Sequence, residues 1–247
     1  MLTQASLRTA QVRTAQVRTA QVRTAQVHTA DVRRAVSTEP GAPPTARKLG
    51  DSIDMMGAPM SFARNEEIYG EREAAEYLYK VISGTVRIYK ILADGRRQIQ
   101  AFHVAGDVFG FEFENEHAFS AEAVSDARIL VVKRSAVLAL AARDNGVARQ
   151  LLALTASELQ RVQGHVMLLV KTAQERVVSF LLEMAGRTRG DSLELPMSRQ
   201  DIADYLGLTI ETVSRTLTSL ESTAAIALPS SRRIVLRNQA ALSRLAS

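Results

Sequence analysis

The segment from Ser198 to Glu221 limits most strongly what this chain can fold into, because it encodes two short helices joined by a tight turn. Ser198, with Asp201 three residues later, is a typical helix start: a hydroxyl cap followed by an acid in the first turn. Gly207 ends this helix, since glycine adopts the left-handed conformation favoured at helix C-termini, and Thr209 caps the next one. The apolar faces that we expect to be buried are Ile202, Ala203 and Leu206, then Val213, Leu217 and Leu220. Such a pair is a helix-turn-helix, whose second helix fits the major groove of DNA.

The second helix carries a polar edge opposite its apolar face, made of Glu211, Ser214 and Arg215. A guanidinium donates two hydrogen bonds to the O6 and N7 atoms of guanine, so Arg215 is the predicted main base-reading residue. Glu211 is predicted to accept from a cytosine amino group or to position Arg215, and Ser214 to meet a neighbouring thymine or adenine. The alternative is an ordinary helical hairpin in a protein core, and the order of the polar edge favours DNA.

The run GLTIETVSR, residues 207–215, resembles the recognition helix of the CRP/FNR superfamily of bacterial transcription regulators. Its E-x-x-S-R pattern is similar to the FNR and FixK branches rather than to CRP itself. A looser similarity extends from about Phe62 to the C-terminus. The resemblance implies a homodimeric regulator that binds double-stranded DNA and acts with RNA polymerase. It further implies an activator of genes for low-oxygen or nitrogen-oxide respiration.

By the same resemblance, Ser198, Gln200, Thr209 and Thr212 fall where relatives contact DNA phosphates. Such contacts fix the register of a protein on DNA without reading sequence. Ile210 stands where CRP itself has an arginine. This difference implies a palindrome with TTGA-type half-sites, as in the FNR and FixK relatives, rather than a CRP site.

Between about Phe62 and Lys133 the sequence changes to short runs rich in β-branched and aromatic residues, which are typical of strands. The predicted strands are residues 77–82, 86–91, 99–104, 108–110 and 128–132. Gly84 separates the first two, and Asp94-Gly95, a strong hairpin signal, separates the next pair. Strands and turns at this spacing predict a sandwich or barrel, and the segment resembles the jelly-roll-like β-roll of cyclic-nucleotide-binding domains.

The nucleotide-binding residues of those domains are mostly missing from this chain. Their phosphate cassette places a Glu shortly after a Gly, and an Arg-Ser or Arg-Thr pair before the next strand. Phe111 stands at the first position and Phe119-Ser120 at the second. A buried cyclic phosphate without an arginine partner would carry an uncompensated charge, so we predict no cyclic-nucleotide binding.

Other cofactors of this superfamily also lack support in the sequence. An iron–sulfur cluster needs cysteines, and the chain has none. His103, His117 and His165 are candidate haem ligands, but no two have metal-ligand spacing. We therefore predict no cofactor, and a haem- or small-ligand-gated regulator of the same superfamily is the alternative. No nucleophile elbow, P-loop, metal cluster or paired-carboxylate signature predicts an enzyme.

From about Asn145 to Lys171 the sequence predicts one long helix with a heptad seam. The seam residues that we expect at a dimer interface are Leu152, Thr155, Leu159, Val162, Val166 and Leu169. A seam sustained over three to four heptads predicts a two-stranded coiled coil. The alternative is a helix packed on its own β-roll, and we expect different faces of the helix to make the two contacts.

Thr172 and Glu175 form a predicted capping box that opens a further helix, which Gly186 is expected to end. The remaining predicted elements are a strand at 193–195, a hairpin at 226–236 and a closing helix at 242–245. We interpret the hairpin as the wing of a winged helix, with Arg232 or Arg233 reaching DNA phosphates. Solvated turn arginines are the alternative.

Residues 8–32 repeat a five-residue unit, RTAQV four times and then HTADV. A period of five keeps no residue type on one face of a helix or strand, so residues 1–48 are predicted to be a disordered low-complexity tail. This tail carries a net charge of +6, against +5 for the whole chain. A DNA-binding interpretation therefore depends on the placement of residues and not on bulk charge.

Taken together, these patterns predict an α+β protein. The predicted domains are the tail (1–48), a β-roll (49–143), a dimerisation helix (144–171) and a winged helix-turn-helix (172–247). No apolar run approaches the length of a membrane span, and the N-terminus lacks the apolar core of a secretory signal. Together with the lack of cysteine, this favours a cytoplasmic protein.

Overall fold

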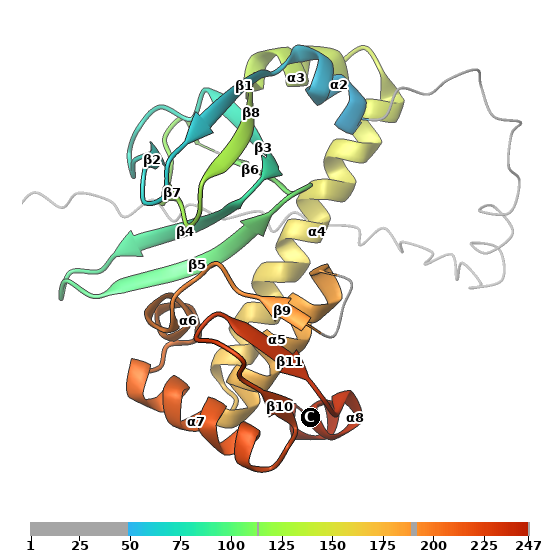
Figure 1. The fold of residues 1–247 in the computed structure, drawn as a ribbon. Coiled ribbons are helices and arrows are strands. Elements are labelled where there is room, and N and C mark those ends of the chain that lie inside the picture. Colours follow the sequence, from blue (N-terminus) through green and yellow to red (C-terminus); the bar gives the residue numbers. More distant parts are fainter. Residues whose placement is uncertain (1–48, 113, 189–191, 247) are drawn as a thin grey trace, which may run out of the picture. The chain divides into compact units, whose positions relative to one another are not determined.

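The computed structural model describes residues 49–112, 114–188 and 192–246, which form an α+β protein as predicted. The five-residue repeat and the rest of the predicted tail lie outside the described residues. Figure 1 shows a β-rich half in blue and green, a long helix in yellow, and a C-terminal half in orange and red. This order agrees with the predicted succession of β-roll, long helix and winged helix-turn-helix.

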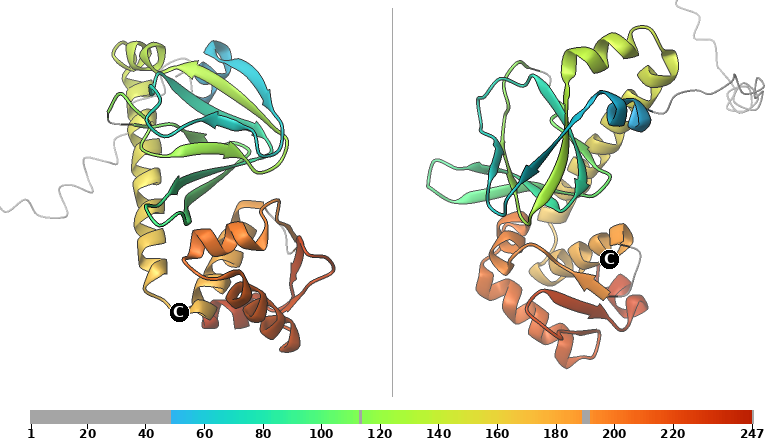
Figure 2. Two further views of the ribbon diagram at one scale, coloured as in Figure 1. Left: turned by 90° about the vertical axis from the view of Figure 1, so that its left-hand side faces the viewer. Right: turned by 45° about the horizontal axis from the view of Figure 1, so that its top comes forward.

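Two four-stranded antiparallel sheets make up the β-roll, with strand orders β1-β8-β3-β6 and β2-β7-β4-β5. Figure 2 shows the β-roll from two further sides, in blue and green. The first sheet contains β1 (Ala58–Phe62), β3 (Tyr77–Ser83), β6 (Val108–Phe109) and β8 (Ala127–Lys133). The second contains β2 (Glu67–Tyr69), β4 (Thr85–Ile91), β5 (Arg97–Val104) and β7 (Ser120–Ala123). The five predicted strands correspond to β3, β4, β5, β6 and β8. The sequence did not predict β1, β2 and β7, which are short and contain few β-branched residues.

Three helices close one end of the β-roll: α2 (Leu49–Met56), α3 (Arg134–Ala141) and the start of α4 (Asn145–Leu169). Their shared apolar cluster consists of Leu49, Ile53, Leu78, Leu130, Val132, Val137 and Val147. Asp144 caps α4, because its Oδ1 atom accepts hydrogen bonds from the amides of Gly146 and Val147 at 2.8 and 3.2 Å. Leu151 and Leu154 pack against the same cluster. One face of α4 therefore contacts its own β-roll, as expected if different faces of this helix contact the roll and a second chain.

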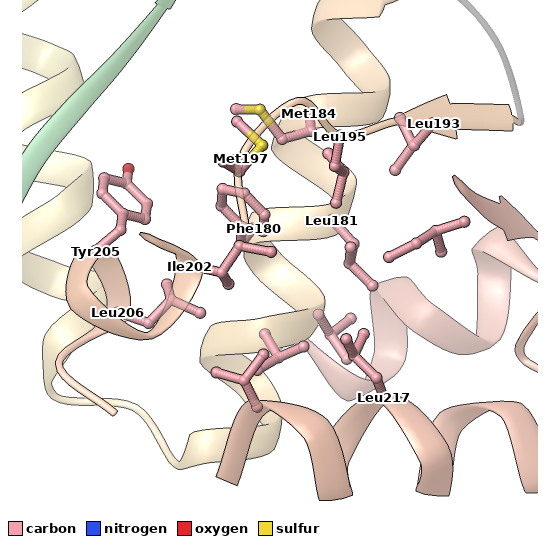
Figure 3. Packing of buried hydrophobic residues seen from close by; sticks show 14 of the residues in the cluster. Phe180, Leu181, Met184, Leu193, Leu195, Met197, Ile202, Tyr205, Leu206 and Leu217 are labelled. Atoms are coloured by element: carbon pink, nitrogen blue, oxygen red, sulfur yellow. The ribbon is translucent and has the colours of Figure 1, made fainter. Parts of the chain in front are cut away.

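The C-terminal half is a winged helix-turn-helix, with a three-stranded sheet in the order β10-β11-β9. Its elements are α5 (Ala173–Thr188), β9 (Ser192–Glu194), α6 (Arg199–Leu206), α7 (Ile210–Ser222), β10 (Ile226–Ala227), β11 (Arg233–Leu236) and α8 (Gln239–Leu245). Figure 3 shows Phe180, Leu181 and Met184 of α5 packed among side chains of α6, α7 and β9. The apolar faces predicted for α6 and α7 are buried in this core.

The predicted start of α5 is confirmed, whereas its predicted end is wrong. The Thr172 amide donates to Glu175 Oε2 at 2.7 Å, as a capping box requires. The helix continues through Gly186 to Thr188. A helical glycine costs only about 1 kcal/mol relative to alanine, so a single glycine does not end a helix that packing stabilises. The long helix α4 likewise ends at Leu169, two residues before its predicted end.

The β-roll and the winged helix-turn-helix share one apolar core. Ile99, Phe102 and Val124 of the roll belong to the same buried cluster as the residues of α5, α6 and α7. The Phe102 ring lies 5.4 Å from the Tyr205 ring of α6 and 6.3 Å from the Phe180 ring of α5, measured between centroids. The helix-turn-helix is therefore packed directly against strand β5.

Candidate nucleic-acid interface

The helix-turn-helix forms through the capping residues that the sequence predicts. The Asp201 amide donates to Ser198 Oγ at 3.1 Å, and the Ser198 amide donates to Asp201 Oδ2 at 2.9 Å. Gly207 has a φ of 62° and ends α6 in the left-handed conformation. The Thr212 amide donates to Thr209 Oγ1 at 3.2 Å and so fixes the start of α7. These local bonds set the angle at which α7 leaves the turn.

Replacing Gly207 by alanine is expected to lower the free energy of unfolding by about 1–2 kcal/mol, since a Cβ is strained in the left-handed conformation. The added methyl would meet Leu169 and Arg176 no closer than 3.6 Å. The loss of stability would therefore come from backbone strain and not from a steric clash. Gly186→Ala is the control, because Gly186 is helical with open space around it. The free energy of unfolding of that variant is expected to rise by about 0.5–1 kcal/mol. Chemical denaturation measures both, and changes of the same sign would contradict this explanation.

The two faces of α7 separate core residues from candidate base readers. Its buried side chains are Val213, Leu217 and Leu220, as predicted. Glu211 and Arg215 are exposed, one turn apart, and Ser214 is half-buried. Hydrogen bonds from the Glu211 backbone amide and from Thr209, together with the charge of Arg215, lower the pKa of Glu211. Glu211 is therefore an ionised acceptor beside a guanidinium at the start of the helix.

Arg199, which the sequence analysis did not single out, contacts this polar edge from α6. Its Nη1 atom donates to Ser214 Oγ at 3.3 Å. Its Nε atom is buried without a hydrogen-bond partner among the described residues. The guanidinium thus lies behind Ser214 and holds the hydroxyl of a candidate base reader. A pairing across the turn between residues 15 positions apart leaves no local signal in the sequence.

The four predicted phosphate contacts lie at the starts of the two helices, Ser198 and Gln200 at α6 and Thr209 and Thr212 at α7. Ser198 and Thr209 use their side-chain oxygens to cap α6 and α7. Gln200 is exposed, and its amide donates to Asp204 Oδ1 at 2.6 Å. The hydroxyls of Thr209 and Thr212 are 3.1 Å apart. Two of these residues therefore have a structural role, and their contacts with phosphate stay predictions.

The hairpin between β10 and β11 forms the predicted wing. Arg232 lies exposed in the turn before β11, and Arg233 lies exposed at its first position. The Arg233 Nε atom donates to Ser192 Oγ at 3.1 Å, which links this arginine to β9. Arg232 is therefore the better candidate for a phosphate contact, and this role stays a prediction.

The predicted dimer seam leaves apolar side chains of α4 in contact with solvent. Leu152, Leu159 and Val166 are 71%, 58% and 55% exposed. Thr155 is also exposed, whereas Val162 and Leu169 are half-buried. Large apolar side chains left exposed at regular intervals on one helix are the pattern expected of a protein–protein contact. Leu152, Leu159 and Val166 belong to none of the apolar clusters of the described residues and are accessible to a second chain, whereas Val162 lines a cavity of the roll.

A partly open cavity of about 130 Å³ lies between the β-roll and α4. Its ionisable lining residues are Tyr69, His103, Glu112 and Glu158, and the described lining contains no arginine or lysine. Phe111, which stands where a cassette glutamate is expected, also lines the cavity. Sites for drug-sized ligands usually measure about 300–1,000 Å³. The described lining thus offers carboxylates and no cation to a cyclic phosphate, and the absence of cyclic-nucleotide binding stays a prediction.

The three candidate haem ligands lie in different surroundings. His103 is buried, and burial together with the charges of Arg161 and Arg187 holds its pKa well below the ordinary value. His117 stacks on the Tyr69 ring at 3.6 Å, and His165 lies 4.2 Å from the Tyr205 ring. Across residues 49–112, 114–188 and 192–246, no group of three or more acidic, histidine or cysteine side chains is arranged to hold a metal ion. Within the same residues, no helix is long and apolar enough to span a membrane.

Known protein families match both halves of the chain. Residues 59–144 match the family described as a cyclic nucleotide-binding domain. Residues 175–245 match the family described as a Crp-like helix-turn-helix domain. These ranges coincide with the β-roll and with the winged helix-turn-helix.

Full-length relatives are similar over most of the chain, and they are regulators and not enzymes. The nitrogen fixation regulation protein FixK of Azorhizobium caulinodans is 54% identical over 202 residues, 79% of this chain and 82% of that protein. The protein of the same name from Rhizobium meliloti is 41% identical over 210 residues, 81% of this chain and 96% of that protein. The solved structure of FixK2 from Bradyrhizobium japonicum has a TM-score of 0.75 and 50% identity, covering 77% of this chain and 98% of that one. The chain belongs to the CRP/FNR family of DNA-binding transcription regulators, and within that family it is similar to the FixK proteins.

Proposed function

We propose that this protein is a homodimeric activator that binds a palindrome with TTGA-type half-sites. Arg215 reads guanine, while Glu211 and Ser214 complete the reading edge. Ser198, Gln200, Thr209 and Thr212 hold the DNA backbone. The observation that carries this proposal is the exposed polar edge of α7 on a helix whose other side is fully buried.

Dimerisation through α4 supports the proposal of a palindromic site. The exposed seam around Leu159 suits a second copy of the same helix, and a two-fold pair places two α7 helices on one face. Two recognition helices related in this way bind half-sites about one turn of DNA apart. Double-stranded DNA, a second copy of this chain and RNA polymerase are thus the proposed partners, in the cytoplasm.

Binding is proposed to need neither cAMP nor an iron–sulfur cluster. The chain has no cysteine, and the cavity of the roll presents Glu112 and Glu158 where a phosphate would need a cation. Similarity to FixK proteins, which are named for the regulation of nitrogen fixation, supports a role in gene regulation, and we propose genes of low-oxygen or nitrogen-oxide respiration as the targets.

Selection of bound duplexes from a random DNA pool tests this function. The expected result is a two-fold symmetric consensus with TTGA in each half. A consensus without symmetry, or one with a CRP-type half-site, would contradict the proposal.

A further inference from the structure

The first turn of α6 carries a buried aspartate whose carboxylate is held by both halves of the molecule. Asp201 is only 3% exposed. Its Oδ1 atom accepts hydrogen bonds from Arg87 of β4 at 2.9 Å and from Arg97 of β5 at 2.6 Å. Its Oδ2 atom accepts from the amide and the hydroxyl of Ser198, at 2.9 and 2.8 Å. Both oxygens of Asp201 therefore have defined donors, from the roll on one side and from the α6 cap on the other.

Two more acidic side chains complete this arrangement. Arg87 also donates to Glu122 of β7 at 2.5 Å, and Arg97 donates to Asp204 of α6 at 2.8 Å. The α6 ion cluster, as we name it, consists of Arg87, Arg97, Glu122, Asp201 and Asp204. It joins three strands of the β-roll to the first and second turns of α6. Arg87 is itself only 7% exposed, so the connection runs through the interior.

The charges of the cluster favour one orientation of α6. Burial alone would raise the pKa of Asp201, but hydrogen bonds from Ser198 and the charges of Arg87 and Arg97 outweigh it and lower the pKa. Asp201 is therefore ionised at neutral pH. The desolvation of a buried ion pair largely offsets its attraction, so such a pair adds little stability. A displaced Asp201 would be a buried and unpaired charge, which is strongly unfavourable.

A third arginine, Arg176, holds the opposite end of α6. Arg176 of α5 donates to the carbonyl oxygen of Leu206 at 2.9 Å and to that of Leu169, the last residue of α4, at 2.5 Å. Its Nε atom donates to the carbonyl oxygen of Lys171 at 2.8 Å. The C-terminus of α6 is thus tied to the end of α4, while its N-terminus is tied to the roll. Helix α6 cannot rotate without breaking one set of bonds.

This placement has a consequence for DNA binding by a dimer. If α4 carries the two-fold axis, the separation of the two α7 helices depends on how each helix-turn-helix is oriented on its own roll and α4. We infer that Arg87 and Arg97 are positioning residues that set the half-site spacing this protein recognises, although they do not touch DNA. The inference rests on the proposed dimeric function and names the residues that fix the orientation of each helix-turn-helix in the dimer.

The test compares spacing profiles of the full chain and of the variant Arg87→Leu. Affinity is measured for a single half-site duplex, for the optimal palindrome, and for palindromes with one base pair inserted or removed. The variant is expected to lose about tenfold in affinity for the optimal palindrome and to lose most of its preference for that spacing. Its affinity for the single half-site is expected to match that of the parent, because α7 and its caps are untouched.

Three further variants make the result specific. Arg128→Leu removes the same charge from an exposed position on β8 and is expected to keep the parent profile. Arg97→Gln, at a partly exposed position, is expected to broaden the spacing preference without unfolding the protein. Arg87→Lys retains the charge and is expected to recover part of the preference.

The outcomes separate positioning from a merely structural role. Equal losses for Arg87→Leu on the half-site and on the palindrome would mean a damaged helix-turn-helix and would overturn the inference. An unchanged spacing profile in both Arg87→Leu and Arg97→Gln would also overturn it. A parent protein that gains nothing from a second half-site would contradict the dimeric function itself, and the inference with it.

Discussion

Replacing Leu159 and Val166 together by lysine is expected to yield a folded monomer that no longer binds the palindrome. Both side chains are more than half exposed in the single chain, so lysines there face water and leave the fold intact. In a dimer they would lie on the seam, where like charges must be desolvated next to each other. We expect dimer affinity to fall by at least about 100-fold, the equivalent of about 3 kcal/mol.

Sedimentation measures this change, and a matched variant controls for added charge. Gln160→Lys with Met167→Lys introduces the same two charges, seven residues apart and one position along α4 from the seam. Gln160 and Met167 are both exposed. This control is expected to remain dimeric and to bind DNA, with melting temperatures similar for the two variants. A seam variant that stays dimeric would show that this face of α4 is not the interface.

Arg215→Ala is expected to relax sequence preference at one base pair in each half-site. Loss of a bidentate guanine contact costs about 1–3 kcal/mol, and two symmetric half-sites double that loss. Arg215 is exposed on α7 and no described salt bridge holds it, so the substitution should leave the fold unchanged. The measurement is a binding titration against the consensus and against all single-base variants of each half-site.

Comparison with Gln200→Ala separates recognition of the base sequence from contact with the DNA backbone. Gln200 lies on α6 and its side chain is exposed, so its loss should weaken all duplexes to a similar extent. Arg215→Ala should instead change the ranking of the duplexes. If both variants kept the parent ranking, Arg215 would not be a base reader. If Gln200→Ala changed the ranking at one base pair, its predicted contact with phosphate would be wrong.

Local signals predicted the helix-turn-helix well, because its helices begin and end with residues whose side chains or backbone act within a few positions. Ser198, Gly207 and Thr209 occupy the predicted caps. Gly186 failed as a signal, since packing of α5 outweighs the modest helix penalty of one glycine. Strand β1 escaped prediction because its Ala-Pro-Met-Ser-Phe sequence lacks β-branched residues, and its proline is tolerated at a sheet edge.

The contacts that position the site could not be predicted, because they join distant parts of the sequence. Arg87 and Asp201 are 114 residues apart, and each alone suggests only a charged surface residue. Arg176 likewise reads as an ordinary helical arginine, although it binds carbonyl oxygens at the ends of two other helices. Periodicity and capping identify elements, whereas the pairing of charges across domains depends on the folded topology.

We propose that this chain binds a two-fold DNA site as a dimer without a bound ligand. The most direct measurement is a titration in air of the purified full chain against a TTGA-type palindrome and a scrambled duplex, repeated with added cAMP and with added haem. A ligand shifts a conformational equilibrium only through differential contacts, and the described lining of the cavity, which includes Glu112 and Phe111, contains no cation for a phosphate. We expect specific binding in air that neither addition changes. Specific binding that appeared only after cAMP or haem was added would contradict it and would favour a ligand-gated regulator.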